Sequence, residues 1–80
     1  MLNQKQILEY AIKGINGDIE KLDNQLRKGQ KMIEQYYKGE PIKSKLSIYQ
    51  IEETCKKLRT DIENLEKEKD SLKWALAEIE

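Results

Sequence analysis

The sequence predicts an all-α protein, an antiparallel helical hairpin of the coiled-coil type. Apolar residues recur at steps of four and three along two long segments, and one stop-and-start signal separates these segments. The chain has 80 residues, 38% of them hydrophobic and none of them Phe, so it has little material for a large globular core. We therefore expect residues 1–80 to form a single helical hairpin domain.

The first apolar series predicts a helix over residues 3–38. Its average step of 3.5 residues is the period of a left-handed coiled-coil seam, whose positions alternate between a and d of the heptad. Gly29 is the one position of the series without a side chain. The series consists of Leu8, Ile12, Ile15, Ile19, Leu22, Leu26, Gly29, Ile33 and Tyr36.

Glycines near the start of this helix weaken it. Gly14 and Gly17 each cost about 1 kcal/mol or less relative to Ala, and a break with Asp18 as a fresh N-cap is an alternative. However, Ile15 and Ile19 keep the heptad phase across the glycines, which a loop would lose. We expect one continuous helix.

A loop over residues 39–46 follows. Gly39 is typical of the left-handed residue that ends a helix, and Pro41 cannot continue one. Ser47 then fits an N-cap, because Gln50 lies three residues further on and completes a capping box. A connection this short predicts that the second helix turns back along the first.

The second apolar series predicts a helix over residues 47–79 with the same period. Lys69 is its one charged member, and we expect its stem to pack while its ammonium group reaches solvent. Alternatively, this polar a position fixes the register and the oligomeric state. Cys55 is expected to be a small buried residue near Gly29, where we expect either a close approach of the two backbones or a small hole. The series consists of Ile48, Ile51, Cys55, Leu58, Ile62, Leu65, Lys69, Leu72, Leu76 and Ile79.

A two-helix seam covers each apolar side chain on one side only. We therefore expect the protein to self-associate as a homodimer or higher oligomer, with two hairpins forming a four-helix bundle. A marginal monomer covered by Lys and Glu stems is the alternative. The predicted oligomer seam comprises Leu8, Ile12, Ile15, Ile19, Leu22, Leu26, Ile33, Ile51, Leu58, Ile62, Leu65, Leu72 and Leu76.

Three apolar or aromatic residues outside the seam form a candidate partner patch. Antiparallel pairing brings Ile7, Tyr10 and Trp74 to the open end of the hairpin. Because Trp and Tyr are enriched at contact hot spots, we expect this patch to meet a partner or a second copy. We expect Trp74 to be buried in the assembled protein, against Tyr10 and Ile7 or across an oligomer contact. Alternatively, Trp74 lies over neighbouring Lys and Glu stems and has no role.

Charge is balanced over the chain, with 15 basic and 15 acidic residues, but it is separated along the hairpin. Residues 27–59 hold nine Lys and Arg against four Asp and Glu, and the rest of the chain carries the compensating negative charge. Basic residues beside aromatics can bind phosphates and stack on bases. The candidate contacts are Tyr36, Tyr37, Lys43, Lys45 and Tyr49. The overall neutrality of the chain favours two alternative roles for these lysines. Either they keep the loop soluble, or they contact the acidic end of a second hairpin.

The composition argues against catalysis and against cofactor or metal binding. The chain has no His and one Cys, so it lacks the usual general base, nucleophile pairs and zinc ligands. Neither GxGxxG nor GK[ST] occurs, and no cofactor is expected. The longest apolar run is Trp74–Ala77, so we expect no membrane association, and the single Cys suits the cytoplasm.

The sequence therefore favours a non-catalytic protein-interaction module, an accessory protein or inhibitor that docks onto a protein partner. The first alternative is a binder of a phosphorylated ligand, nucleic acid or nucleotide, through the basic, Tyr-containing end of the hairpin beside the loop. The second is an obligate structural oligomer without a ligand. The excess of Lys (13) over Arg (2) and the ten Ile residues are typical of AT-rich genomes and of their phages and mobile elements.

Overall fold

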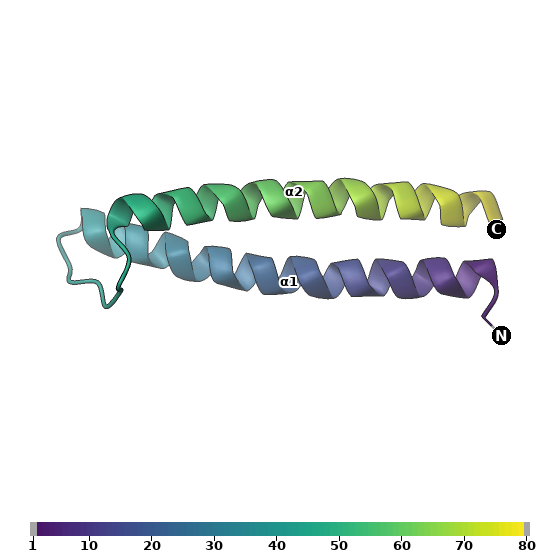
Figure 1. Cartoon of the computed structure of the whole chain (residues 1–80), viewed down its shortest axis with the longest axis horizontal. Coiled ribbons are helices and arrows are strands. Elements are labelled where there is room, and N and C mark those ends of the chain that lie inside the picture. Colours follow the sequence, from purple (N-terminus) through teal and green to yellow (C-terminus); the bar gives the residue numbers. More distant parts are fainter. Residues whose placement is uncertain (1, 80) are drawn as a thin grey trace.

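Two long helices make up the structure. The computed structural model describes residues 2–79, with α1 at Gln4–Tyr37 and α2 at Ile48–Ile79. The helices lie side by side and antiparallel, with both ends of the chain at the same end of a rod of 55 × 20 × 16 Å (Figure 1). The all-α prediction is confirmed, and the packed helices fit the predicted hairpin. Of the expected domain over residues 1–80, Met1 and Glu80 lie outside the described residues.

The start of α1 is fixed by a capping box between Asn3 and Gln6, which was not among the features predicted from the sequence. The backbone N–H of Gln6 donates to Asn3 Oδ1 at 2.8 Å, and the backbone N–H of Asn3 donates to Gln6 Oε1 at 3.1 Å. These bonds satisfy backbone donors that have no partner inside the helix. The spacing Asn-x-x-Gln carries the same signal as the Ser-x-x-Gln pattern at Ser47.

The end of α1 is a Schellman motif around Gly39. The N–H of Gly39 donates to the carbonyl of Tyr36 at 3.0 Å, and the N–H of Glu40 donates to the carbonyl of Gln35 at 2.9 Å. Gly39 has φ +79°, which a residue with a Cβ rarely adopts. The helix therefore stops at the Gly39 signal that the sequence predicts, with Lys38 as its C-cap.

The start of α2 has the capping box expected from the sequence. The N–H of Gln50 donates to Ser47 Oγ at 3.2 Å, and the N–H of Ser47 donates to Gln50 Oε1 at 2.9 Å. The helices are slightly shorter than the expected ranges 3–38 and 47–79, because Asn3, Lys38 and Ser47 are caps rather than helical residues.

Helix α1 continues without a break through Gly14 and Gly17, as expected. A Cβ added at either glycine would meet nothing within 4 Å. Packing therefore does not require glycine at these two positions.

The core lies mainly in the half of the hairpin nearest the loop, which we call the tip. Leu26, Ile51, Cys55 and Leu58 form the buried cluster, and Cys55 is only 1% exposed. A Cβ on Gly29 would come within 2.5 Å of Cys55 Sγ, so of the two alternatives expected at this point, close approach or a small hole, the structure has the close approach. Toward the open end, Ile15 is the remaining buried hydrophobic residue of the described chain.

Candidate interaction surfaces

The predicted seam residues are all at least partly shielded from solvent, but most are not fully buried. Four of them are buried: Ile15, Leu26, Ile51 and Leu58. The others are half-buried: Leu8, Ile12, Ile19, Leu22, Ile33, Ile62, Leu65, Leu72 and Leu76. A single hairpin therefore leaves much of its apolar surface in contact with water.

The heptad defines two edges that flank this seam. In an antiparallel pair the g positions of both helices line one side, and the e positions line the other. The g edge consists of Ala11, Asp18, Gln25, Met32, Thr54, Asp61, Glu68 and Ala75. The e edge consists of Glu9, Asn16, Asp23, Gln30, Tyr37, Glu52, Arg59, Glu66 and Lys73. The two edges differ in side-chain length and charge.

A central groove opens on the g edge. It has a volume of about 500 Å³ and lies near the middle of both helices. The half-buried Leu22 and Leu65 line it together with polar residues of the rim. The rim residues are Asp18, Lys21, Gln25, Asp61, Asn64 and Glu68. The groove thus joins an apolar floor to a mainly acidic rim.

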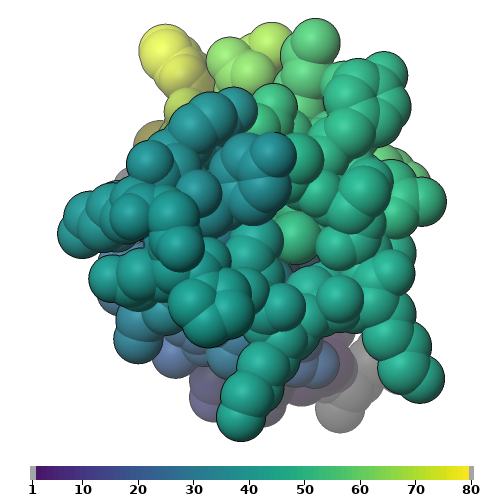
Figure 2. All heavy atoms as spheres, turned by 90° about the vertical axis from the view of Figure 1, so that its left-hand side faces the viewer, coloured from purple at the N-terminus to yellow at the C-terminus, as the bar shows by residue number. Residues whose placement is uncertain are grey.

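A second groove, the tip groove, lies on the same edge nearer the loop. Its volume is about 210 Å³ and its lining is mostly apolar. Gly29, Cys55 and Leu58 belong to its lining, so it opens directly over the core cluster. The loop contributes Leu46, which is 49% exposed. Figure 2 looks onto this end of the molecule, where the teal side chains of the loop and the adjoining helix ends gather.

The e edge is more polar. The hydroxyl of Tyr37 donates to Glu52 Oε1 at 2.8 Å and so joins the end of α1 to the start of α2. This hydrogen bond and the negative charge of Glu52 raise the pKa of Tyr37 above its ordinary value of about 10. Farther along, Arg27 Nε lies 3.1 Å from Asp23 Oδ2 in an exposed ion pair.

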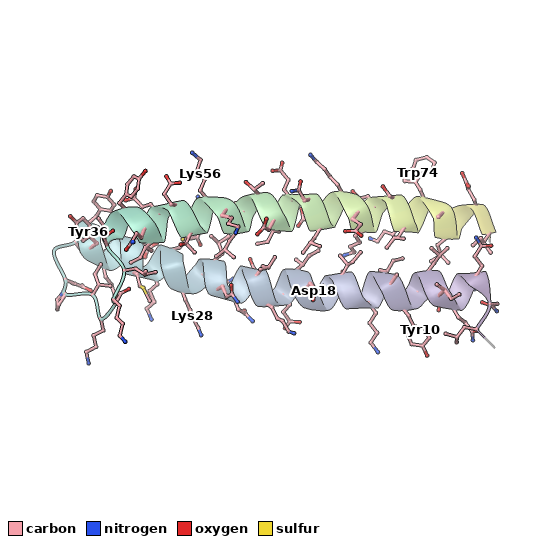
Figure 3. All side chains as sticks on the ribbon, viewed as in Figure 1. Tyr10, Asp18, Lys28, Tyr36, Lys56 and Trp74 are labelled. Atoms are coloured by element: carbon pink, nitrogen blue, oxygen red, sulfur yellow. The ribbon has the colours of Figure 1, made fainter. Side chains whose placement is uncertain are left out.

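The candidate partner patch does not form a single surface within one hairpin. Tyr10 and Trp74 lie at the same end but point away from opposite sides of the hairpin (Figure 3). Both occupy f positions, which face away from the seam in each helix, so antiparallel pairing separates them. The expected packing of Trp74 against Tyr10 and Ile7 is therefore wrong within one chain. Trp74 is 74% exposed, Tyr10 62% and Ile7 53%.

The basic tip brings its candidate residues to one end of the molecule. Lys43, Lys45, Tyr36 and Tyr49 are exposed there. Tyr37 is also exposed, but its hydroxyl is bonded to Glu52, and its ring meets that of Tyr36 edge-on with a centroid distance of 5.3 Å. A carboxylate therefore lies among the side chains proposed to meet a phosphate.

The described residues contain no group of three or more His, Cys, Asp or Glu side chains that could hold a metal ion. Within residues 2–79 neither helix is long and apolar enough to span a membrane. The fold defines the chain as a two-helix hairpin with exposed candidate interaction surfaces. Comparison with known protein families, with curated proteins and with solved structures gave no significant match.

Proposed function

We propose that the protein is a non-catalytic interaction module that self-associates through its seam into a four-helix bundle. The observation that carries this proposal is the incomplete burial of the seam, in which nearly all residues of the open half remain half-buried. Full burial of a Leu or Ile side chain is worth about 1.5–3 kcal/mol relative to exposure. A second hairpin that covers one edge would recover part of this free energy.

The aromatic residues on the outside support a further protein partner. Trp74 and Tyr10 expose large rings at f positions, where a self-associating hairpin has no need of them. Trp and Tyr often dominate the free energy of protein–protein contacts. We propose that the hairpin acts as an accessory protein or inhibitor that presents these side chains to its partner, in a reducing cytoplasm that suits the free thiol of Cys55.

Sedimentation equilibrium from micromolar to millimolar concentration tests the self-association. The expected species has at least twice the chain mass of 9.5 kDa. Replacement of Leu22 or Leu65 by Asp is expected to dissociate and unfold the protein together, because an unpaired carboxylate buried in the seam costs several kcal/mol. A cooperatively melting monomer at all these concentrations would overturn the proposal.

The second candidate function is the binding of a phosphorylated ligand at the tip, favoured by exposed Tyr36 and Tyr49 beside Lys43 and Lys45. If the tip binds an oligonucleotide, neutralising Lys43 and Lys45 lowers the log–log salt slope by roughly 0.7–0.9 per lost phosphate contact. Tyr49→Ala costs about 1–3 kcal/mol per stacked base with little change in slope. We expect oligonucleotides and nucleotides to give no signal at physiological ionic strength, because Glu52 lies within the tip and the chain is neutral overall.

A further inference from the structure

We propose that the second copy docks on the g edge, with the two hairpins antiparallel, so that the tip of each lies against the open end of the other. This inference rests on the proposed self-association and adds to it the contact face and the orientation.

The shape of the two edges selects the face. Both grooves described along the seam open on the g edge, and their linings include Leu22, Leu65 and the core around Cys55. Near its ends this edge carries the short or apolar residues Ala11, Met32 and Ala75, all of them half-buried. A helix of a second copy can approach such positions closely.

The e edge is less suited to a second hairpin. The Tyr37–Glu52 hydrogen bond crosses it at the tip, and exposed Glu9, Arg59 and Lys73 follow along it. The e edge carries six charged side chains against three on the g edge, so covering the e edge would remove more charged groups from water, which is costly. The g edge is therefore the more favourable docking face.

The separation of charge selects the orientation. Residues 27–59 carry a net charge of +5, and residues 1–26 and 60–80 together carry −5. Parallel hairpins would place two basic tips together and two acidic ends together. Antiparallel hairpins place each tip against an acidic end, which is the complementary arrangement.

The spacing along the g edge fits the antiparallel arrangement. The central groove is lined by residues 18–25 of α1, which spans Gln4–Tyr37, so it lies close to the middle of the rod. When two hairpins are centred on each other, α1 lies across α1 of the other copy, and Ala11 faces Met32. A small residue then meets a large apolar one at both ends of the contact. Each long face of the hairpin measures at least 55 by 16 Å. The area of such a face is larger than the roughly 800 Å² that each partner buries in a standard interface.

The same register brings Asp61 of one copy near Glu68 of the other, because both belong to the central groove. This contact of like charges weakens association. A variant that removes one of these charges is therefore expected to raise the affinity of the dimer rather than lower it. On the g edge, Asp61→Asn is expected to lower the dissociation constant of the dimer at least about threefold. The matched e-edge variant Glu66→Gln removes the same charge and is expected to leave the constant unchanged.

A second pair of variants tests the same face by steric block. Ala11→Arg puts a long cation on the g edge, where it would face the basic tip of the other copy. Asn16→Arg adds the same charge to the same half of α1, but on the e edge. Sedimentation of the full chain is expected to show a dissociation constant raised about tenfold or more for Ala11→Arg and less than about twofold for Asn16→Arg.

The orientation is tested by one spin label on Lys43→Cys in the full chain, since native Cys55 is 1% exposed and protected from the reagent. Antiparallel hairpins separate the two labels by nearly the full 55 Å length, whereas parallel hairpins bring them within about 20 Å. Short label distances, or equal effects of the g-edge and e-edge variants, overturn this inference alone if the wild-type protein is an oligomer. A monomeric wild type overturns the proposed function as well.

Discussion

At the scale of single residues, the packing of the two helices near Cys55 depends on glycine at one position. Gly29 and Cys55 face each other across the seam, and a Cβ on Gly29 would come within 2.5 Å of Cys55 Sγ. Gly17 lies in the same helix with nothing within 4 Å of an added Cβ. The sequence predicted this difference in part, because Gly29 falls on the seam and Gly17 does not.

Gly29→Ala is therefore expected to lower the free energy of unfolding by about 1–3 kcal/mol, because overpacking outweighs the better helix propensity of Ala. Gly17→Ala, the matched control, is expected to raise it by up to about 1 kcal/mol. Urea denaturation at one protein concentration measures both. An increase in stability for Gly29→Ala would show that the helices do not approach closely there.

The hydrogen bond from Tyr37 to Glu52 makes stability depend on alkaline pH. Because folding raises the pKa of Tyr37 above about 10, the contribution of this bond is present below pH 10 and is lost as the pH rises through the raised pKa. Ultraviolet titration of tyrosinate is expected to show a group whose pKa lies above the ordinary tyrosine value of about 10. Glu52→Gln should lower the pKa of that group, and Tyr37→Phe should remove its signal. A wild-type titration indistinguishable from that of Glu52→Gln would contradict the bond.

At the scale of the elements, local sequence signals account for the boundaries. The Ser47 capping box and the Gly39 stop were predictable because each depends on residues within a few positions of the boundary. The Asn3 box carried an equally readable signal. By contrast, the pairing of Tyr37 with Glu52 depends on how the loop sets the helix ends, which spacing alone does not give. The prediction that Ile7, Tyr10 and Trp74 form one patch was wrong within a single hairpin. That prediction took into account how far along the rod each residue lies, but not the direction in which the f positions point.

Loss of the Ser47 cap tests how α2 begins. Ser47→Ala is expected to cost about 1 kcal/mol of stability, because the backbone N–H of Gln50 loses its side-chain acceptor. The control is Ser71→Ala inside α2, where the hydroxyl only donates to the carbonyl of Lys67 and Ala is the better helix former. Thermal melts should show a lower Tm for the first variant and an equal or higher one for the second. Equal melts would mean that the cap does not stabilise the helix start.

At the scale of the whole molecule, the heptad predicted the hairpin and the interface between its helices, but not which edge would be open. That difference arises from side-chain length at the flanking positions, such as Ala11 on one edge and Arg59 on the other. In a bundle built on the g edge, the f positions of both helices lie on the outside. Trp74 should therefore remain in water when two hairpins assemble, which departs from the burial expected from the sequence.

The fluorescence of Trp74 follows from this arrangement. We expect water-like emission and full quenching by iodide in the assembled protein, because the side chain is 74% exposed and lies away from the seam. Addition of the protein partner should shift the emission to the blue. A blue-shifted, protected Trp74 in the purified oligomer would mean that the f face takes part in self-association.

We propose that the seam of one hairpin is too poorly covered to be stable by itself, so that folding and association are coupled. Thermal melting at a series of protein concentrations, from micromolar to millimolar, tests it most directly, with mass measured in the same samples. We predict that Tm rises with concentration, because mass action stabilises a folded oligomer. A single concentration-independent Tm from a species of 9.5 kDa would contradict the account.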